Sequence, residues 1–261
     1  MGVLNVTPDS FSDGGKFFDA TSAIDQASSM VEEGASIIDI GGESTRPGAK
    51  AVSVQDELNR VLPVIEALYG KINVPISIDT SKPEVMEKAV EAGASMINDV
   101  NALRADGALG MAAKLKTDVC LMHMQGSPRT MQNNPTYEDV VKDIKVFFKE
   151  RINACKLAGI ELSSISLDPG FGFGKNLGHN IALLKNLSEF HEFGVSILAG
   201  LSRKSMIGTL LGDKDVDSRM IGSVTAALIA VENGADIIRV HDVAETSDAL
   251  RVWQQIKNFR E

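Results

Sequence analysis

EEGASIIDIGG, at residues 32–42, is the first of three copies of one pattern, which returns as EAGASMINDV at 91–100 and ENGADIIRVHD at 232–242. In each copy an acidic helix end meets a glycine, at the place where helices often end in a left-handed residue. These glycines are Gly34, Gly93 and Gly234. A short apolar run follows, with the length and β-branching of a buried parallel strand. The pattern predicts a repeated unit of helix, glycine cap and strand.

Each strand of this repeat ends in polar side chains that are costly to bury without a partner. They are Asp39 in the first copy, Asn98 and Asp99 in the second, and Arg239, His241 and Asp242 in the third. The repeat therefore indicates both an architecture and a face on which chemistry can gather.

The alternation continues between the copies. Strands are expected at 2–6, 36–40, 76–79, 95–99, 118–122, 165–167, 196–199 and 236–240. Helices are expected at 21–33, 54–68, 83–92, 107–115, 137–158, 180–190, 218–233 and 243–257, and Ser81-Lys82-Pro83 predicts a helix start with a capping side chain before proline. Eight βα units predict an α/β fold, a (β/α)8 TIM barrel that forms a single domain over residues 1–261. A doubly wound sheet is the alternative.

Composition limits the classes of partner. With 261 residues and 44% hydrophobic content the chain can bury a full core, and its net charge of −9 argues against nucleic acid or an anionic membrane surface as the main partner. The sequence shows no apolar run of about 18 residues and no signal peptide, so we expect a soluble cytoplasmic protein. Cys120 and Cys155 are widely separated and predict structural thiols, and the histidines lack the spacing of a zinc site.

Two long loops follow the first two strands. NVTPDSFSDGG at 5–15 is a polar loop with glycine hinges and a lone phenylalanine, and it is too particular for an ordinary surface loop. GGESTRPG at 41–48 puts glycines beside hydroxyls and a guanidinium, which fits a lid or an anion-contacting loop better than a plain turn.

Later strands end in groups suited to a flat, polar-edged ligand. DPGFGFGK at 168–175 lets backbone and aromatic faces close on a flat ring, and a carboxylate such as Asp168 can pair with the amidine-like edge of a guanine or pterin. Asn98 can bond the same edge, and a functional role is favoured for Asp79, although an isolated strand-end aspartate is often only a helix cap. GLSRKSMIG at 200–208 opens a short helix, whose start lets Ser205 receive a carboxylate or phosphate.

Barrel closure brings distant residues together. The last strand pairs with the first in a closed barrel, so Arg239 and His241 are expected beside Asn5. A guanidinium, an imidazole and a carboxamide form a candidate diphosphate site, and Asn5 is a candidate magnesium ligand.

These strings carry a family resemblance. Residues 2–15 and 39–48, together with 168–173 and 202–205, resemble dihydropteroate synthase, and the resemblance runs in order over essentially the whole chain. One departure is that Met1 stands at the first strand, where family members usually carry a short lead-in. We expect a truncated lead-in to affect the bottom of the barrel and not its catalytic face.

The resemblance implies the site residue by residue. Pterin contacts fall on Asp79, Asn98, Met122, Asp168, Phe173, Gly200 and Lys204. The 4-aminobenzoate contacts fall on Phe11, Thr45, Arg46, Pro47 and Ser205. Diphosphate falls to Asn5, Thr45, Arg46, Arg239 and His241, with Mg²⁺ as the cofactor held by Asn5. The catalytic set is Asn5, Asp13, Lys204, Arg239 and His241.

The resemblance also implies the reaction. 6-Hydroxymethyl-7,8-dihydropterin diphosphate and 4-aminobenzoate give 7,8-dihydropteroate and diphosphate by a dissociative substitution, in which Asp13 supports the pterin cation. A homodimer is implied, and sulfonamides are the expected inhibitors, weakened by substitutions at Phe11, Thr45 or Pro47. Two other functions stay open: a methyltetrahydrofolate:corrinoid methyltransferase, which needs no diphosphate site, and a non-catalytic pterin-binding subunit.

Overall fold

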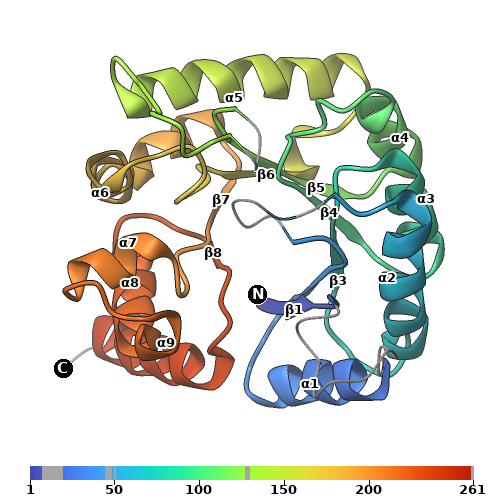
Figure 1. The fold of residues 1–261 in the computed structure, drawn as a ribbon, viewed down its shortest axis with the longest axis horizontal. Coiled ribbons are helices and arrows are strands. Elements are labelled where there is room, and N and C mark those ends of the chain that lie inside the picture. The colour runs from blue at the N-terminus through green and yellow to red at the C-terminus, as the bar shows by residue number, and fades with distance from the viewer. Residues whose placement is uncertain (8–19, 45–48, 50, 127–129, 260–261) are drawn as a thin grey trace.

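The strands of the computed structural model curl into one parallel sheet, which the helices surround (Figure 1). The structure describes residues 1–261 except 8–19, 45–48, 50, 127–129 and 260–261. In this part of the chain the strands are β1 (Gly2–Asn5), β2 (Ile38–Gly41), β3 (Ile76–Asp79), β4 (Met96–Asp99), β5 (Asp118–Met122), β6 (Ile165–Asp168), β7 (Ser196–Ala199) and β8 (Ile237–Ile238). Their order in the sheet is their order in the sequence, which excludes a doubly wound sheet.

The helices alternate with the strands along the chain. They are α1 (Ala20–Glu32), α2 (Val54–Leu68), α3 (Pro83–Glu91), α4 (Ala108–Leu115), α5 (Val140–Leu157), α6 (Leu177–Lys185), α7 (Ser205–Leu210), α8 (Met220–Glu232) and α9 (Val243–Asn258). Short 3₁₀ helices lie at η1 (Leu162–Ser164), η2 (Leu187–Phe193) and η3 (Val216–Ser218). None of the helices within the described ranges is long and apolar enough to cross a membrane.

Backbone hydrogen bonds join the end of the chain to its beginning. Val3 N donates to Val240 O at 2.9 Å, and Val240 N donates to Met1 O at 2.9 Å. Gly2 and Val240 form a parallel bridge just beyond β8. The predicted TIM barrel is confirmed, and so is the expected position of the last strand beside the first.

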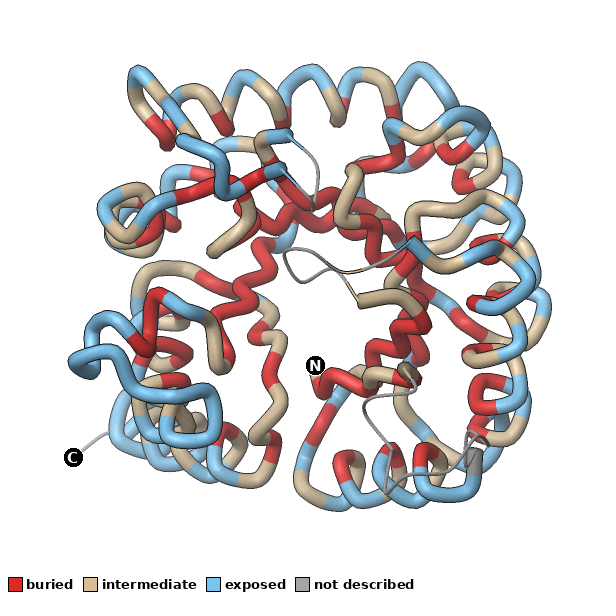
Figure 2. The backbone as a smooth tube through the Cα atoms, viewed as in Figure 1, coloured by how far each residue is buried: buried red, intermediate tan, exposed pale blue. Residues whose placement is uncertain are grey.

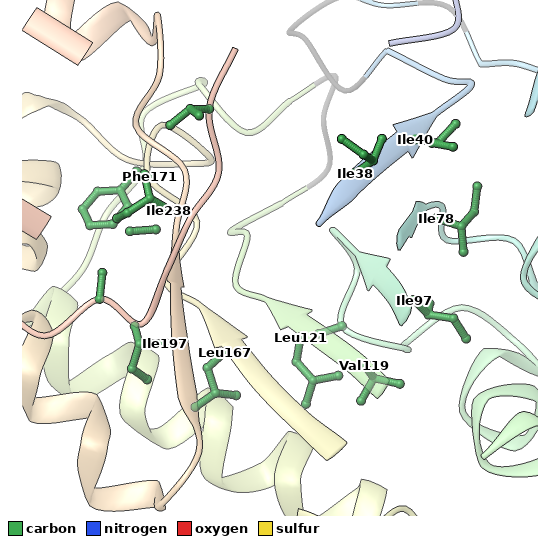
Figure 3. Packing of buried hydrophobic residues seen from close by; sticks show 14 of the residues in the cluster. Ile38, Ile40, Ile78, Ile97, Val119, Leu121, Leu167, Phe171, Ile197 and Ile238 are labelled. Carbon is green, nitrogen blue, oxygen red and sulfur yellow. The ribbon is translucent and has the colours of Figure 1, made fainter. Parts of the chain in front are cut away.

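Strand residues alternate between an apolar layer under the helices and the inside of the barrel. Ile38, Ile40 and Ile78 are fully buried in the main core, which Figure 3 shows at close range. Buried segments follow the strands, and exposed ones lie on the outer sides of the helices (Figure 2). Cys120 joins a separate cluster with Met96 and Leu198, and both cysteines are buried and unpaired, as predicted for structural thiols.

Two local predictions were wrong. The helix expected at 180–190 begins earlier, at Leu177, because Asn176 and His179 form a capping box, and after Lys185 the chain continues as the 3₁₀ helix η2. Ser81 does not cap α3, because its hydroxyl donates instead to Asp99, and the residue before Pro83 makes no side-chain cap.

The three repeat glycines adopt the left-handed backbone that the pattern predicts, with φ of 106°, 123° and 101° for Gly34, Gly93 and Gly234. A Cβ on Gly93 would stand 2.3 Å from Cδ2 of Tyr69. Gly159 follows α5 with a φ of 92°, and a Cβ there would meet nothing within 4 Å.

We expect Gly93→Ala to destabilise the protein more than Gly159→Ala. Both variants strain the backbone, at a cost of roughly 1–3 kcal/mol, but only Gly93→Ala adds the clash with Tyr69, for roughly 1–3 kcal/mol more. Urea unfolding of both variants beside the parent protein measures the difference. Equal losses would show that Tyr69 moves aside at no cost.

Candidate active site

Polar residues from neighbouring strands line up at the carboxyl end of the barrel. Asn5 pairs in register with Gly41, Gly41 with Asp79, and Asp79 with Asn98. The carboxyl ends of barrel strands are where TIM-barrel enzymes place their sites. The register therefore sets an amide, a carboxylate and a second amide along one edge, with Asp39 two residues below Gly41.

Arg239 ties the two ends of the sheet together. It follows β8 directly, and its backbone N donates to Ala199 O at 3.0 Å. Its guanidinium Nε donates to Asp39 Oδ2 at 2.6 Å, and its Nη2 donates to Asp79 Oδ2 at 2.9 Å. One cation thus holds two carboxylates that lie 200 and 160 residues away in sequence.

Asp39 also fixes the orientation of Asn98. The Asn98 amide nitrogen donates to Asp39 Oδ2 at 3.0 Å, so the amide oxygen is left as the acceptor that faces away from Asp39. Asp39 is fully buried, and its other oxygen, Oδ1, has no hydrogen-bond partner among the described residues. The carboxylate therefore couples Arg239 to Asn98.

Burial shifts the ionisation of the carboxylates and of the lysine at this end. It raises the pKa of Asp79 to about 7, against the opposing charge of Arg239. It also raises the pKa of Asp168, against the charge of Lys204. Burial lowers the pKa of Lys204 to about 8, while the negative charge of Asp168 opposes that shift. Such shifts are common where side chains do chemistry.

Lys204 lies beside an aromatic and sulfur-rich wall. Its Nζ donates to Phe171 O and stands 4.6 Å from the centre of the Phe173 ring. A Cβ on Gly200 would lie 3.9 Å from that Nζ and 3.8 Å from Cβ of Arg239, so this glycine leaves room between the two cations. Phe173 packs against a buried cluster of Met122, Met124 and Met131.

The remaining described candidates lie at the same end. His241 Nδ1 is 3.1 Å from Ser202 Oγ, which also accepts from the His241 backbone N at 3.1 Å. Ser205 is exposed and is the first residue of α7, as the sequence predicted. The predicted positions Phe11, Asp13, Thr45, Arg46 and Pro47 lie outside the described residues.

Comparison with known proteins decides the family. The family model of pterin binding enzymes matches residues 1–241. Dihydropteroate synthase of Haemophilus influenzae is 57% identical over 258 residues, which are 99% of this chain and 94% of that protein. The chain belongs to the dihydropteroate synthase family. The synthase prediction is confirmed, and with it a transferase of folate biosynthesis; the methyltransferase and the non-catalytic subunit find no support.

Solved dihydropteroate synthases share the whole fold. The Xanthomonas albilineans enzyme with 4-aminobenzoic acid has a TM-score of 0.94 and 52% identity, over 99% of this chain and 93% of that one. The Yersinia pestis enzyme with a sulfonamide drug complex also has a TM-score of 0.94 and 52% identity, over 99% and 94% of the two chains.

Sequence reasoning missed three buried residues of this dihydropteroate synthase fold. Asp39 was noted as a strand-end carboxylate but given no role, and Lys175 was quoted only as the end of the glycine and phenylalanine motif. His123 gave no signal beyond its place after a predicted strand. For Asp39 a signal existed, since a buried strand-end carboxylate needs a cation.

We expect Asp39→Asn to lower kcat/KM by about 10- to 100-fold. The substitution removes the negative charge on the oxygen that accepts from both Arg239 Nε and Asn98 Nδ2. Steady-state rates with the dihydropterin diphosphate varied would measure the loss. Asp118→Asn, at the exposed start of β5, is the matched control and should match the parent enzyme. Equal kcat/KM for Asp39→Asn and the parent would contradict the coupling.

Proposed function

We propose that the carboxyl end of the barrel joins 6-hydroxymethyl-7,8-dihydropterin diphosphate to 4-aminobenzoate and releases diphosphate. The observation that carries the proposal is the Arg239 network, which sets a cation for the leaving group beside Asp79 and the fixed amide of Asn98. The pterin and the diphosphate are parts of one substrate, so the residues that bind the two parts need to be neighbours. Arg239, Asp79 and Asn98 meet this requirement.

The pterin half has a matched set of partners. Asp79, Asn98 and Asp168 offer acceptor oxygens to the N–H groups of the pterin edge, and the Lys204 ammonium can donate to the ring carbonyl. Met122 and Phe173 supply a soft apolar wall against the ring faces, and Gly200 keeps the space above Lys204 open. Because Asp39 fixes the Asn98 amide, one of these acceptors is oriented before substrate binds.

The diphosphate half is assigned to Arg239, His241 and Asn5, with Thr45 and Arg46 from the second loop. Arg239 can stabilise the negative charge that develops as the bond to the leaving group breaks. His241 is oriented by Ser202 through the backbone and the ring. Charge stabilisation of this kind suits a dissociative substitution, in which the dihydropterin carries the cation and Asp13 supports it.

Asn5 fits a magnesium ion. Mg²⁺ commonly takes one or two protein oxygens and completes its octahedron with phosphate oxygens and water. Asn5 Oδ1 lies at the barrel end, 3.9 Å from where a Cβ on Gly41 would stand. When bound, the ion supplies positive charge to the departing diphosphate.

The second substrate needs a flat slot with an anion contact. We assign it to Phe11, Thr45, Arg46, Pro47 and Ser205, and the neighbour with 4-aminobenzoic acid and the one with a sulfonamide drug support a site for both ligands. The aryl amine is a neutral nucleophile, so orientation contributes more than a strong base. A cytoplasmic location stays a prediction.

We expect the purified protein to form dihydropteroate and diphosphate from both substrates with Mg²⁺, and to lose the activity when EDTA removes the metal. Arg239→Met should lower kcat/KM by about 10²- to 10³-fold, since it removes the main cation for the leaving group. Arg251→Met, on the exposed face of α9, is the matched control. Absence of product from folded parent protein would refute the function.

We also propose a homodimer through α8 and α9. Ile221 and Ile229 lie two turns apart on α8 and are both exposed, and α9 adds exposed Val252 and Ile256. The two helices pack together, at the lower left of Figure 1. Exposed apolar side chains on two helices that pack together support a protein interface.

We expect Ile221→Glu to shift the protein from dimer to monomer in size-exclusion chromatography with light scattering, because burying the new carboxylate at an interface is costly. Leu157→Glu on α5, where the residue is 91% exposed, should leave the dimer intact. A parent protein that elutes as a monomer would refute the interface.

A further inference from the structure

Lys175 is a buried amine that the roles above do not use. The residue is 3% exposed, and the hydrogen bonds of its Nζ run to a ring nitrogen and two backbone carbonyls. Within the described part of the chain, Nζ has three acceptors: His123 Nδ1 at 3.0 Å, His123 O at 3.3 Å and Phe173 O at 2.9 Å. The N–H groups of Nζ thus find their acceptors within the protein.

The acceptor side of this contact is buried and packed against aromatic rings. Burial lowers the pKa of His123 to about 2, so the ring is neutral at working pH and its Nδ1 can accept while Nε2 carries the proton. Phe147 packs edge-on against the ring at 4.9 Å between centroids, and Tyr137 lies at 6.1 Å. Burial lowers the pKa of Lys175 well below its usual range, while the charge of Asp168 opposes that shift.

Backbone contacts hold the loop after β6 on the segment after β5. A Cβ on Gly170 would stand 1.9 Å from His123 O, and one on Gly174 would stand 2.6 Å from Gln125 O. Both glycines have positive φ, so only glycine allows this approach without strain. Lys175 lies at the end of this loop and reaches back to both segments.

The loop positions two groups at the barrel end. Phe173, whose carbonyl accepts from Lys175, puts its ring against Lys204 and the methionine cluster. Gly170 N donates to Asp168 Oδ1 at 2.7 Å, so the backbone of the loop also orients that carboxylate. A shift of the loop would move the carboxylate and the aromatic wall together.

We infer that Lys175, through His123, is a positioning residue that holds the 169–174 loop in the form that binds the pterin ring. The inference rests on the proposed pterin roles of Asp168, Phe173 and Lys204. It assigns to Lys175 an effect on the pterin substrate and not on 4-aminobenzoate, whose proposed contacts lie on other loops.

The test replaces Lys175 by methionine, which keeps the length and apolar stem but removes the donors. Lys175→Met should raise KM for the dihydropterin diphosphate by about tenfold or more, and leave KM for 4-aminobenzoate within about twofold. Tyr137→Phe is the matched control, since it removes one hydrogen bond to the same loop, from Tyr137 Oη to Gly174 O. Equal rises in both variants, or equal rises for both substrates, would overturn the inference.

A pair of variants at His123 tests the same contact from the acceptor side. These variants test the inference even if Lys175→Met does not fold. His123→Asn keeps an acceptor near Nδ1 and should retain the parent KM, whereas His123→Leu should reproduce the rise. A parent-like KM for His123→Leu would overturn the inference.

Asp168→Asn separates the two proposals. If this variant leaves the pterin KM unchanged, the pterin assignment fails. If it raises the pterin KM while Lys175→Met does not, only the inference about Lys175 fails.

Discussion

Burial of Asp39 is the constraint on which the barrel end depends. A carboxylate with no exposed surface is costly unless a cation meets it, and the removal of one partner from a buried pair costs more than the pair contributes. Arg239 meets this need from the far end of the chain, next to a last strand of only two residues, Ile237–Ile238. The same contact that satisfies a buried charge therefore links the last segment of the barrel, through the Arg239 side chain, to carboxylates of its second and third strands.

Strand register places the other residues of the site around the contact between Asp39 and Arg239. Because side chains alternate along each strand, Ile38 and Ile40 enter the apolar layer while Asp39 between them points the other way. Parallel pairing then places Asp79 and Asn98 side by side. Asp39 accepts from the Asn98 amide and shares the Arg239 guanidinium with Asp79. The scaffold and the orientation of the pterin amide follow from one set of hydrogen bonds.

Sequence alone predicted the parts that local chemistry decides. The glycine repeat predicted the helix and strand units of the barrel, because Gly34, Gly93 and Gly234 each take the left-handed backbone that ends a helix before a strand. The sequence did not predict hydrogen-bond partners that only the tertiary fold brings together. Ser81 has the local signal of a helix cap, yet Asp99 from the next strand takes its hydroxyl. Lys175 had no predicted role at the end of the glycine-rich loop, and only the fold shows that its Nζ contacts His123.

Charge at the barrel end differs from that of the whole molecule. The chain carries a net charge of −9, so its overall field repels an anion, and a diphosphate needs local cations. Arg239 is such a cation, yet it is already engaged by Asp39 and Asp79, and its charge opposes the burial that raises the pKa of Asp79 to about 7. A diphosphate bound there would be a third partner of this guanidinium, beside the two carboxylates that already share its charge.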